Sequence, residues 1–234
     1  MPTPENAAQA ASTSATTLDL TLTIGSNPDR FLLVGACSTS TVTGVVFDPG
    51  GADERTLTNI TTLAVSSDTG LSLWKLVAPP TKTAATIRIT KGGGHVAAGA
   101  LGLYDVDQTT PHDAVVTQTF AAGTDPGVSL ASQNADLVFN VIGADGGNPQ
   151  FASGGGQVEH WDTQSASGNF ARACAAASAP GASSVAMSWT LSGTARATGV
   201  IALNLNAPAG GTATGTQTAS LEAAVQRQQI VTGA

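Results

Sequence analysis

The sequence predicts an all-β protein, and three features support that prediction. Apolar and polar residues alternate with a period of two in several segments, most clearly over residues 18–24. Turn sequences rich in Gly, Pro, Asn and Asp separate these segments at short intervals. No segment between residues 17 and 206 shows a sustained period of 3.6. We therefore expect a single β-sandwich or jelly roll of about a dozen antiparallel strands.

The expected strands follow one another along the whole chain. Residues 18–24 alternate strictly, whereas residues 31–37 form the continuous apolar run that is typical of a strand covered on both faces. The other strands of the first half are expected at 41–47, 57–65, 70–77, 84–90 and 96–104. Those of the second half are expected at 114–120, 127–131, 136–144, 157–163, 170–177, 184–191 and 195–206.

Both ends of the chain differ from this β-rich body, which spans residues 17–206. Residues 1–16 are mostly Ala, Ser, Thr and Pro, and this composition favours a flexible N-terminal arm. Residues 207–234 begin with a linker of Ala, Pro, Gly and Thr. We expect that removing residues 1–16 or 207–234 leaves a folded sandwich but abolishes assembly on a partner.

A short helix is expected at residues 220–230, after this linker. Ser220 can cap its first turn, and Glu222 lies where the helix dipole favours an anion. So short a helix is marginal in water and needs a surface to dock on. The apolar side chains expected to make assembly contacts are Leu221, Val225 and Ile230.

A weak internal repeat relates the two halves at an offset of 100 residues. The identical positions are Pro80/Pro180, Thr90/Thr190, Gly93/Gly193, Ala97/Ala197, Gly99/Gly199 and Leu103/Leu203. In both copies an alternating strand leads through a Gly turn into a long apolar strand. Two explanations remain open, which are shared turn chemistry and a pseudo-symmetric sandwich whose halves supply equivalent strands.

Composition and charge exclude several classes of partner. Only 11% of the residues are charged, and the formal net charge is −7, which disfavours a nucleic-acid-binding surface. The sequence has no apolar run of the length needed for a transmembrane helix, so no membrane partner is expected. The N-terminus lacks the basic and apolar regions of a secretory signal, which favours assembly in a cytoplasm.

The two cysteines, Cys37 and Cys174, both lie in apolar runs. Buried free thiols are the simpler interpretation. A disulfide between the two is a second possibility that the sequence leaves open.

Catalytic signatures are missing from the sequence, so we predict no enzyme, no cofactor and no metal centre. Glycosidases need two positioned carboxylates, but Glu159 and Asp162 are three residues apart on an expected strand and should point to opposite faces. His95, His112 and His160 lack the spacing of zinc ligands.

Four residues are candidates for ligand binding. Asp105, Asp107 and Asp113 follow the end of an expected strand and offer oxygen ligands of the type that calcium prefers. The alternative is that Asp107 accepts hydrogen bonds from nearby amides and caps a turn. Trp161, between His160 and Asp162, is the best candidate for an exposed aromatic that contacts a sugar, whereas Trp74 and Trp189 lie in apolar patterns typical of a core.

Several segments together resemble β-sandwich domains of phage virion proteins and of large bacterial surface proteins. They are FLLVGACST (31–39), LSLWKLVAPPTKTAATIRIT (71–90), GALGLYDVDQTTPHDA (99–114), ADLVFNVIGA (135–144) and SVAMSWTL (184–191). The tail TQTASLEAAVQ (216–226) is similar to short modules at the ends of phage structural proteins. The resemblance covers residues 18–206 and implies a fold and a setting, without any catalytic motif.

The expected function is therefore that of a non-enzymatic virion protein, one that decorates the outside of a phage or phage-like head. Its expected partners are the major capsid protein or other virion subunits, bound through the chain ends, and copies of itself in a homo-oligomer such as a trimer. The alternative is a carbohydrate-binding or adhesive module of a tail fibre or cell surface. A polysaccharide-cleaving enzyme that uses Glu159 is a third class.

Overall fold

The computed structural model describes residues 1–209 apart from residues 114, 167 and 169. In this part of the chain every regular element is a β-strand and every strand pairing is antiparallel, so the all-β prediction is confirmed. The described residues form 17 strands rather than about a dozen. Some of the additional strands are short ones within expected loops, such as β5 (Arg55–Thr56) and β13 (Gln150–Ser153).

The first half of the chain forms two sheets. Inner sheet 1 has the order β1-β9-β3-β7-β6, and outer sheet 1 has the order β2-β8-β4-β5. The strands of inner sheet 1 are β1 (Thr3–Ser12), β3 (Phe31–Ser38), β6 (Thr58–Ser66), β7 (Thr69–Val77) and β9 (Val96–Tyr104). Outer sheet 1 adds β2 (Thr17–Ile24), β4 (Val42–Phe47) and β8 (Lys82–Lys91) to β5.

The second half forms two further sheets. Inner sheet 2 has the order β10-β17-β12-β15-β14, and outer sheet 2 has the order β11-β16-β13. The strands of inner sheet 2 are β10 (Val116–Ala121), β12 (Leu137–Asp145), β14 (Val158–Gln164), β15 (Arg172–Pro180) and β17 (Ala197–Leu205). Outer sheet 2 adds β11 (Gly127–Leu130) and β16 (Val185–Ser192) to β13.

The two halves have the same architecture. If β1 is matched with β10, β3 with β12, β6 with β14, β7 with β15 and β9 with β17, the strand order of the two inner sheets is identical. A glycine pair marks the middle of each inner sheet, with Gly35 opposite Gly99 and Gly143 opposite Gly199. The structure therefore supports the pseudo-symmetric explanation of the sequence repeat. We call residues 3–104 repeat 1 and residues 116–205 repeat 2.

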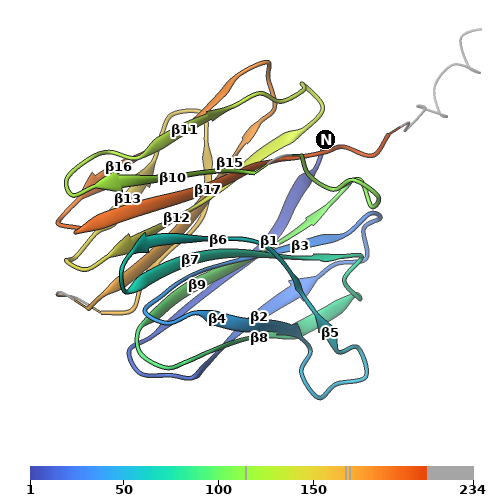
Figure 1. Ribbon diagram of the computed structural model, residues 1–234. Helices are drawn as coiled ribbons and strands as arrows, with labels where there is room; N and C mark the ends of the chain where they lie inside the picture. Colours follow the sequence, from blue (N-terminus) through green and yellow to red (C-terminus); the bar gives the residue numbers. More distant parts are fainter. Residues whose placement is uncertain (114, 167, 169, 210–234) are drawn as a thin grey trace, which may run out of the picture.

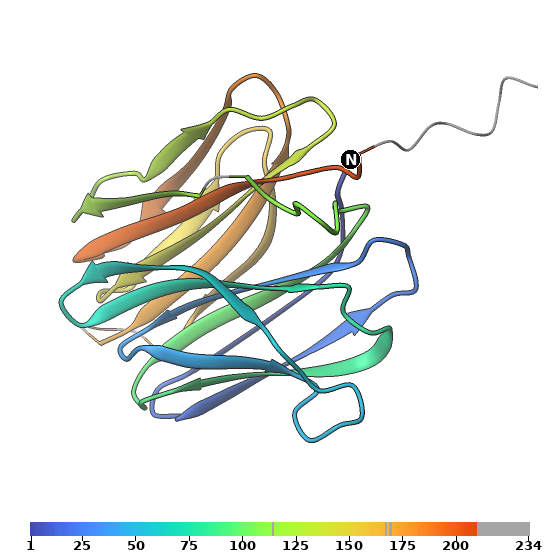
Figure 2. The same ribbon diagram turned by 45° about the vertical axis from the view of Figure 1, so that its right-hand side comes forward.

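The four sheets stack as layers, and three hydrophobic cores separate them (Figures 1 and 2). A central core joins the two inner sheets, and each inner sheet also packs against its own outer sheet. In β3, for example, Phe31 and Leu33 enter the central core, whereas Leu32 and Val34 face outer sheet 1. This two-sided burial explains why the sequence of β3 is apolar without alternation, as expected.

The N-terminal arm is a correction to the sequence-based expectation. Residues expected to be flexible form β1, which pairs with β9 from Thr3↔Tyr104 to Ser12↔Val96. The pairing uses main-chain groups, which any composition supplies, so the Ala-rich sequence did not reveal it. A bulge at Glu5 directs its carboxylate toward outer sheet 1, where it accepts hydrogen bonds from the Gly25 N–H (3.0 Å) and the Asn27 side chain (2.9 Å).

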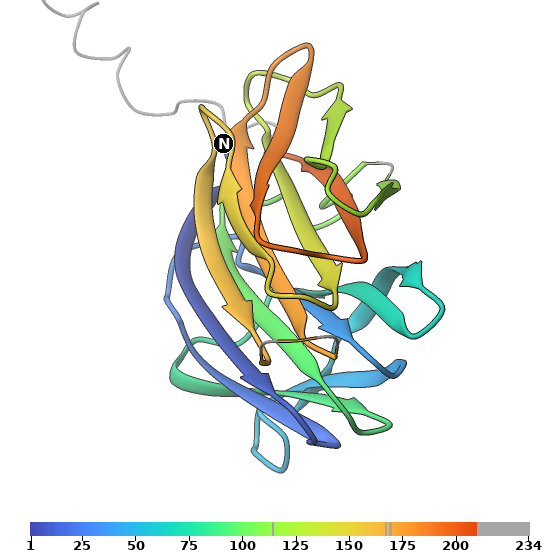
Figure 3. The same ribbon diagram turned by 90° about the vertical axis from the view of Figure 1, so that its left-hand side faces the viewer.

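The expected C-terminal helix and the contact residues Leu221, Val225 and Ile230 lie outside the described residues. Within the described part, no helix is long and apolar enough to span a membrane. Strands β1 and β14, which are the edges of the two inner sheets on one side of the molecule, run beside each other (Figure 3).

Candidate functional site

The N-terminus and the last described residue, Ala209, lie at the same end of the molecule. The N-terminus lies beside the point at which the described chain stops, after Ala209, in all three ribbon views (Figures 1–3). A group of polar residues holds the chain there, and we call it the exit clamp. It consists of Asp107, Asp113, Asp136, Asn204 and Asn206.

Asp107 forms the first part of the exit clamp. Its Oδ1 accepts hydrogen bonds from the N–H groups of Thr109 and Thr110, both at 2.8 Å, and its Oδ2 accepts one from the Ala209 N–H at 3.3 Å. The backbone N–H groups of Thr110 and Thr109 lower the pKa of this carboxyl. The turn-capping interpretation of Asp107 is therefore confirmed.

Asp113 and Asp136 form the second part of the clamp around Asn204. The Asn204 amide donates to Asp113 Oδ2 (3.1 Å) and to Asp136 Oδ2 (3.0 Å), and the Asn206 amide donates to Asp113 Oδ1 (3.0 Å). Asp136 Oδ1 also accepts from the Ala207 N–H at 3.0 Å. These carboxylates, which come from loops far apart in the sequence, fix the last strand and the residues that follow it.

The three aspartates considered for calcium do not converge. Asp105 lies in a turn with a φ of 56° and its N–H donates to the Pro28 carbonyl, whereas Asp107 and Asp113 belong to the exit clamp. A groove of about 350 Å³ adjoins the clamp, and Asp107, Asp113 and Asp136 are among the residues that line it. Among the described residues, no group of three or more His, Cys, Asp or Glu side chains is arranged to hold a metal ion.

Trp161 is buried, which corrects the expectation of an exposed aromatic. Only 3% of it is exposed, and it belongs to the central core. The indole occupies the space over Gly99, where a Cβ would lie 2.3 Å from its Cδ2. It shares the space over Gly35 with Val141, since a Cβ on Gly35 would lie 2.7 Å from the Val141 Cγ2 and 3.3 Å from the indole Cζ2. Trp74 and Trp189 are core residues, as predicted.

Glu159 and Asp162 also differ from the expectation. A β-bulge at His160 inserts one extra residue between Glu159 and Trp161, so the two carboxylates reach the same neighbouring strand. Asp162 accepts from the Phe151 N–H and Glu159 from the Ser153 N–H, both at 3.3 Å. Burial, together with the nearby Glu159, raises the pKa of Asp162. Both carboxylates therefore hydrogen-bond to the backbone of β13.

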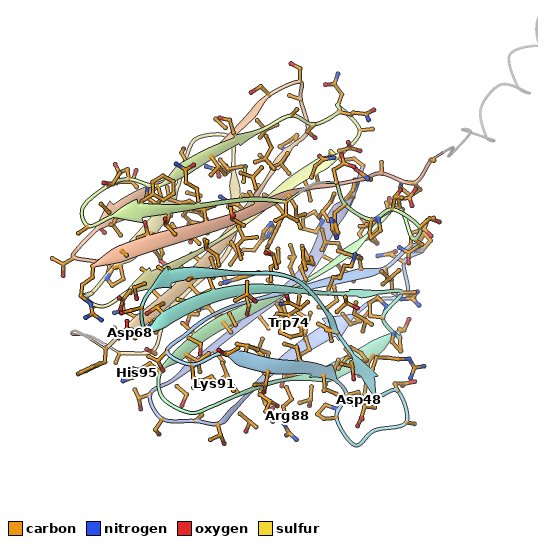
Figure 4. The ribbon with its side chains drawn as sticks, in the orientation of Figure 1. Asp48, Asp68, Trp74, Arg88, Lys91 and His95 are labelled. Atoms are coloured by element: carbon orange, nitrogen blue, oxygen red, sulfur yellow. The ribbon has the colours of Figure 1, made fainter. Side chains whose placement is uncertain are left out.

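A buried ion pair, which the sequence did not predict, lies near the opposite end of the molecule. Arg172 is fully buried and contacts Asp145 at 2.9 Å and the more exposed Asp68 of repeat 1 at 3.4 Å. Arg196 contacts the same Asp145 oxygen at 2.8 Å. Figure 4 labels Asp68 and His95 at this end of the molecule, away from the point at which the described chain stops. A charge in the middle of an Ala-rich run was the sequence signal that could have revealed Arg172.

Comparisons with known proteins give no assignment: no protein-family description, curated protein or solved structure matches this chain.

Proposed function

We propose that this protein is a non-enzymatic structural subunit of a phage or phage-like virion, which decorates the head and binds it through its C-terminal segment. The observation that carries the proposal is the exit clamp. It fixes Ala207 and Ala209 to the body beside the N-terminus. Residues 210–234 therefore continue from one defined point on the body.

The remaining support comes from the body and from the sequence. Carboxylates that were candidates for chemistry accept structural hydrogen bonds: Asp107 in its turn, Glu159 and Asp162 on β13. Stacked sheets with three cores provide a rigid body for display or for packing against neighbours. Many copies on one lattice make individually weak tethers collectively strong. The resemblance to virion β-sandwich domains supplies the setting, with the major capsid protein or another virion subunit as the partner.

Truncation tests this proposal. A chain that ends at Ala209 should keep the thermal stability of the full chain but fail to bind particles, as measured by co-sedimentation and by immunogold electron microscopy. A second variant, Asp107→Asn with Asp136→Asn, keeps the segment and weakens the exit clamp, so it should bind with reduced occupancy. Its thermal stability is measured alongside, because both carboxylates also hold turns of the body. Normal incorporation of the truncated chain would contradict the tethering role. Mass photometry of the full chain tests the expected trimer.

A second candidate function, glycan binding, is favoured by one groove in repeat 1. The groove has a volume of about 350 Å³ and lies between the β3–β4 turn and the β6–β7 hairpin. Hydroxyl side chains dominate its lining, namely Thr39, Ser40, Thr41, Thr62, Ser66, Ser67, Thr69 and Ser72. The Thr69 hydroxyl is buried and has no hydrogen-bond partner among the described residues. Hydroxyls that can both donate and accept suit a neutral sugar.

A glycan array separates the two functions. If the groove binds sugar, the full chain should give array signals that disappear in Thr69→Val and persist after addition of a calcium chelator. Ser129→Ala, at an exposed position of outer sheet 2, is the matched control. An array without signals would leave the virion role as the supported function.

A further inference from the structure

The two cysteines of the chain meet in the central core. They lie 137 residues apart in the sequence, at positions 37 and 174, and come from different repeats. Cys37 belongs to β3 of inner sheet 1, and Cys174 belongs to β15 of inner sheet 2. Both are fully buried free thiols in the same core cluster.

The register of inner sheet 2 places the two side chains close together. A Cβ built on Gly143 would lie 2.9 Å from the Cys37 sulfur and 3.1 Å from the Cys37 Cβ. Gly143 is the direct cross-strand partner of Cys174, and the Cβ positions of such a pair are about 4.5–5.5 Å apart on the same face of the sheet. The Cys37 sulfur therefore lies against the Gly143 position, on the face of inner sheet 2 from which the neighbouring Cys174 side chain projects.

The pKa values of the two thiols also indicate that Cys37 and Cys174 lie near each other. Burial raises the pKa of Cys174 to about 12, and the backbone N–H of Cys37 is one of the groups that oppose this rise. Burial also raises the pKa of Cys37 far above its ordinary value, and the Cys174 thiol adds to the increase. Both thiols are thus protonated and unreactive while the core is closed.

We propose that Cys37 and Cys174 form a disulfide across the central core, covalently joining repeat 1 to repeat 2, when the chain folds in the presence of a low-molecular-weight disulfide. One cysteine thiolate attacks the small disulfide and releases one small thiolate, leaving a mixed disulfide. The second cysteine thiolate attacks the mixed disulfide and releases the other small thiolate. The protein loses two protons and two electrons, and the small disulfide is reduced to two thiols.

The burial of both sulfurs decides when this bond forms and how long it lasts. It forms during folding, before the sheets close, because the native thiols are inaccessible. Once formed, the closed core keeps small reductants out. A bond that closes a loop of this length restricts the unfolded chain strongly, so the cross-linked protein should unfold at higher urea concentration than the reduced one.

Refolding the full chain from urea in a buffer of reduced and oxidised glutathione tests the proposal. After the refolded protein is unfolded again in acidic urea and alkylated with iodoacetamide in urea, it should carry no alkyl groups and have lost two hydrogens. Trypsin should release peptides 31–55 and 173–196 as one joined species that reductant separates. The equilibrium constant for the cross-link should be at least about 100-fold larger in the folded chain than in concentrated urea.

A matched control moves the thiol to the other face of the same strand. Ala36 is buried like Cys37 but faces outer sheet 1, so Ala36→Cys with Cys37→Ala should fold and give no joined peptide. The double variant Cys37→Ala, Cys174→Ala should have a urea midpoint that oxidation does not change. The proposal is overturned if the folded wild type carries two alkyl groups or glutathione adducts, or if the joined protein unfolds at lower urea than the reduced one.

Discussion

Repeat 1 and repeat 2 have the same architecture but carry residue pairs of different charge at equivalent strand positions. In β3, Cys37 lies two residues after Gly35 and pairs with Leu71 of β7. In β12, Asp145 lies two residues after Gly143 and pairs with Arg172 of β15. An apolar pair in one repeat thus corresponds to a buried ion pair in the other. The fold accepts either pair because this position requires buried side chains of suitable shape. The charged pair also contacts the other repeat, since Arg172 binds Asp68 of repeat 1.

The glycine pairs show a second difference between the repeats. The rigid indole of Trp161 fills the space over Gly99, whereas the ends of aliphatic side chains, including Leu63 and Val65, fill the space over Gly199. The same backbone feature therefore accepts one inflexible ring on one side and adaptable groups on the other.

The largest expected effect comes from removing the first strand of repeat 1. Deleting residues 1–12 exposes the edge of β9 and uncovers apolar residues of the layers on both sides, since β1 pairs along the whole length of β9. We expect loss of the soluble folded monomer, measured by circular dichroism and size-exclusion chromatography. A truncated chain that melts within a few degrees of the full chain would show that β1 is dispensable, as the sequence suggested.

The buried ion pair gives the next largest effect. Arg172→Leu should lower the free energy of unfolding by about 3–5 kcal/mol, because it removes one of the two arginines that contact the buried Asp145 among the described residues. Adding Asp145→Cys copies the apolar pair of repeat 1 and should restore most of the loss. Urea unfolding of both single variants and the double variant measures the coupling, and additive losses would refute the equivalence.

The glycine positions should differ in their tolerance of a methyl group. Gly99→Ala should cost about 3 kcal/mol or more, because its Cβ collides with Trp161, whereas Gly199→Ala should cost about 1–2 kcal/mol as Leu63 and Val65 shift. Gly44→Ala, where nothing lies within 4 Å of the new Cβ, is the control. Equal losses at Gly99 and Gly199 in urea unfolding would contradict the difference in rigidity.

The last prediction concerns the bulged edge strands, which carry His160 in β14 and Ile60 in β6. Burial lowers the pKa of His160 to about 4, below the value of about 6.5 in an unfolded chain. The unfolded state therefore binds the proton first, and stability falls as the pH drops from 6.5 to 4, by about 2 kcal/mol after allowing for partial exposure. Urea unfolding of His160→Gln, which can still reach Ser178, should show a weaker pH dependence. An unchanged pH profile would assign the effect to other groups.

Local patterns explain which parts of the fold were predictable. Alternation revealed β2, the uninterrupted apolar run revealed the two-sided burial of β3, and the position of Asp107 before Thr109 and Thr110 indicated a turn cap. Each of these depends on neighbours in the sequence. The environment of Trp161 depends instead on Gly35 and Gly99 in the other repeat, so its polar neighbours pointed to exposure.

The sequence by itself determined most of the strands, the apolar positions that need covering and the burial of both cysteines, because a two-residue period and turn chemistry act over a few residues. Only the tertiary structure decided which segment covers which. It made a terminal Ala-rich segment into β1, turned Glu159 and Asp162 toward one strand through a bulge, and placed Cys37 and Cys174 in the same core. The physical reason is that packing between layers brings together residues that can lie more than 100 positions apart in the sequence. A local pattern shows that a residue must be covered, but it does not show which distant segment covers it.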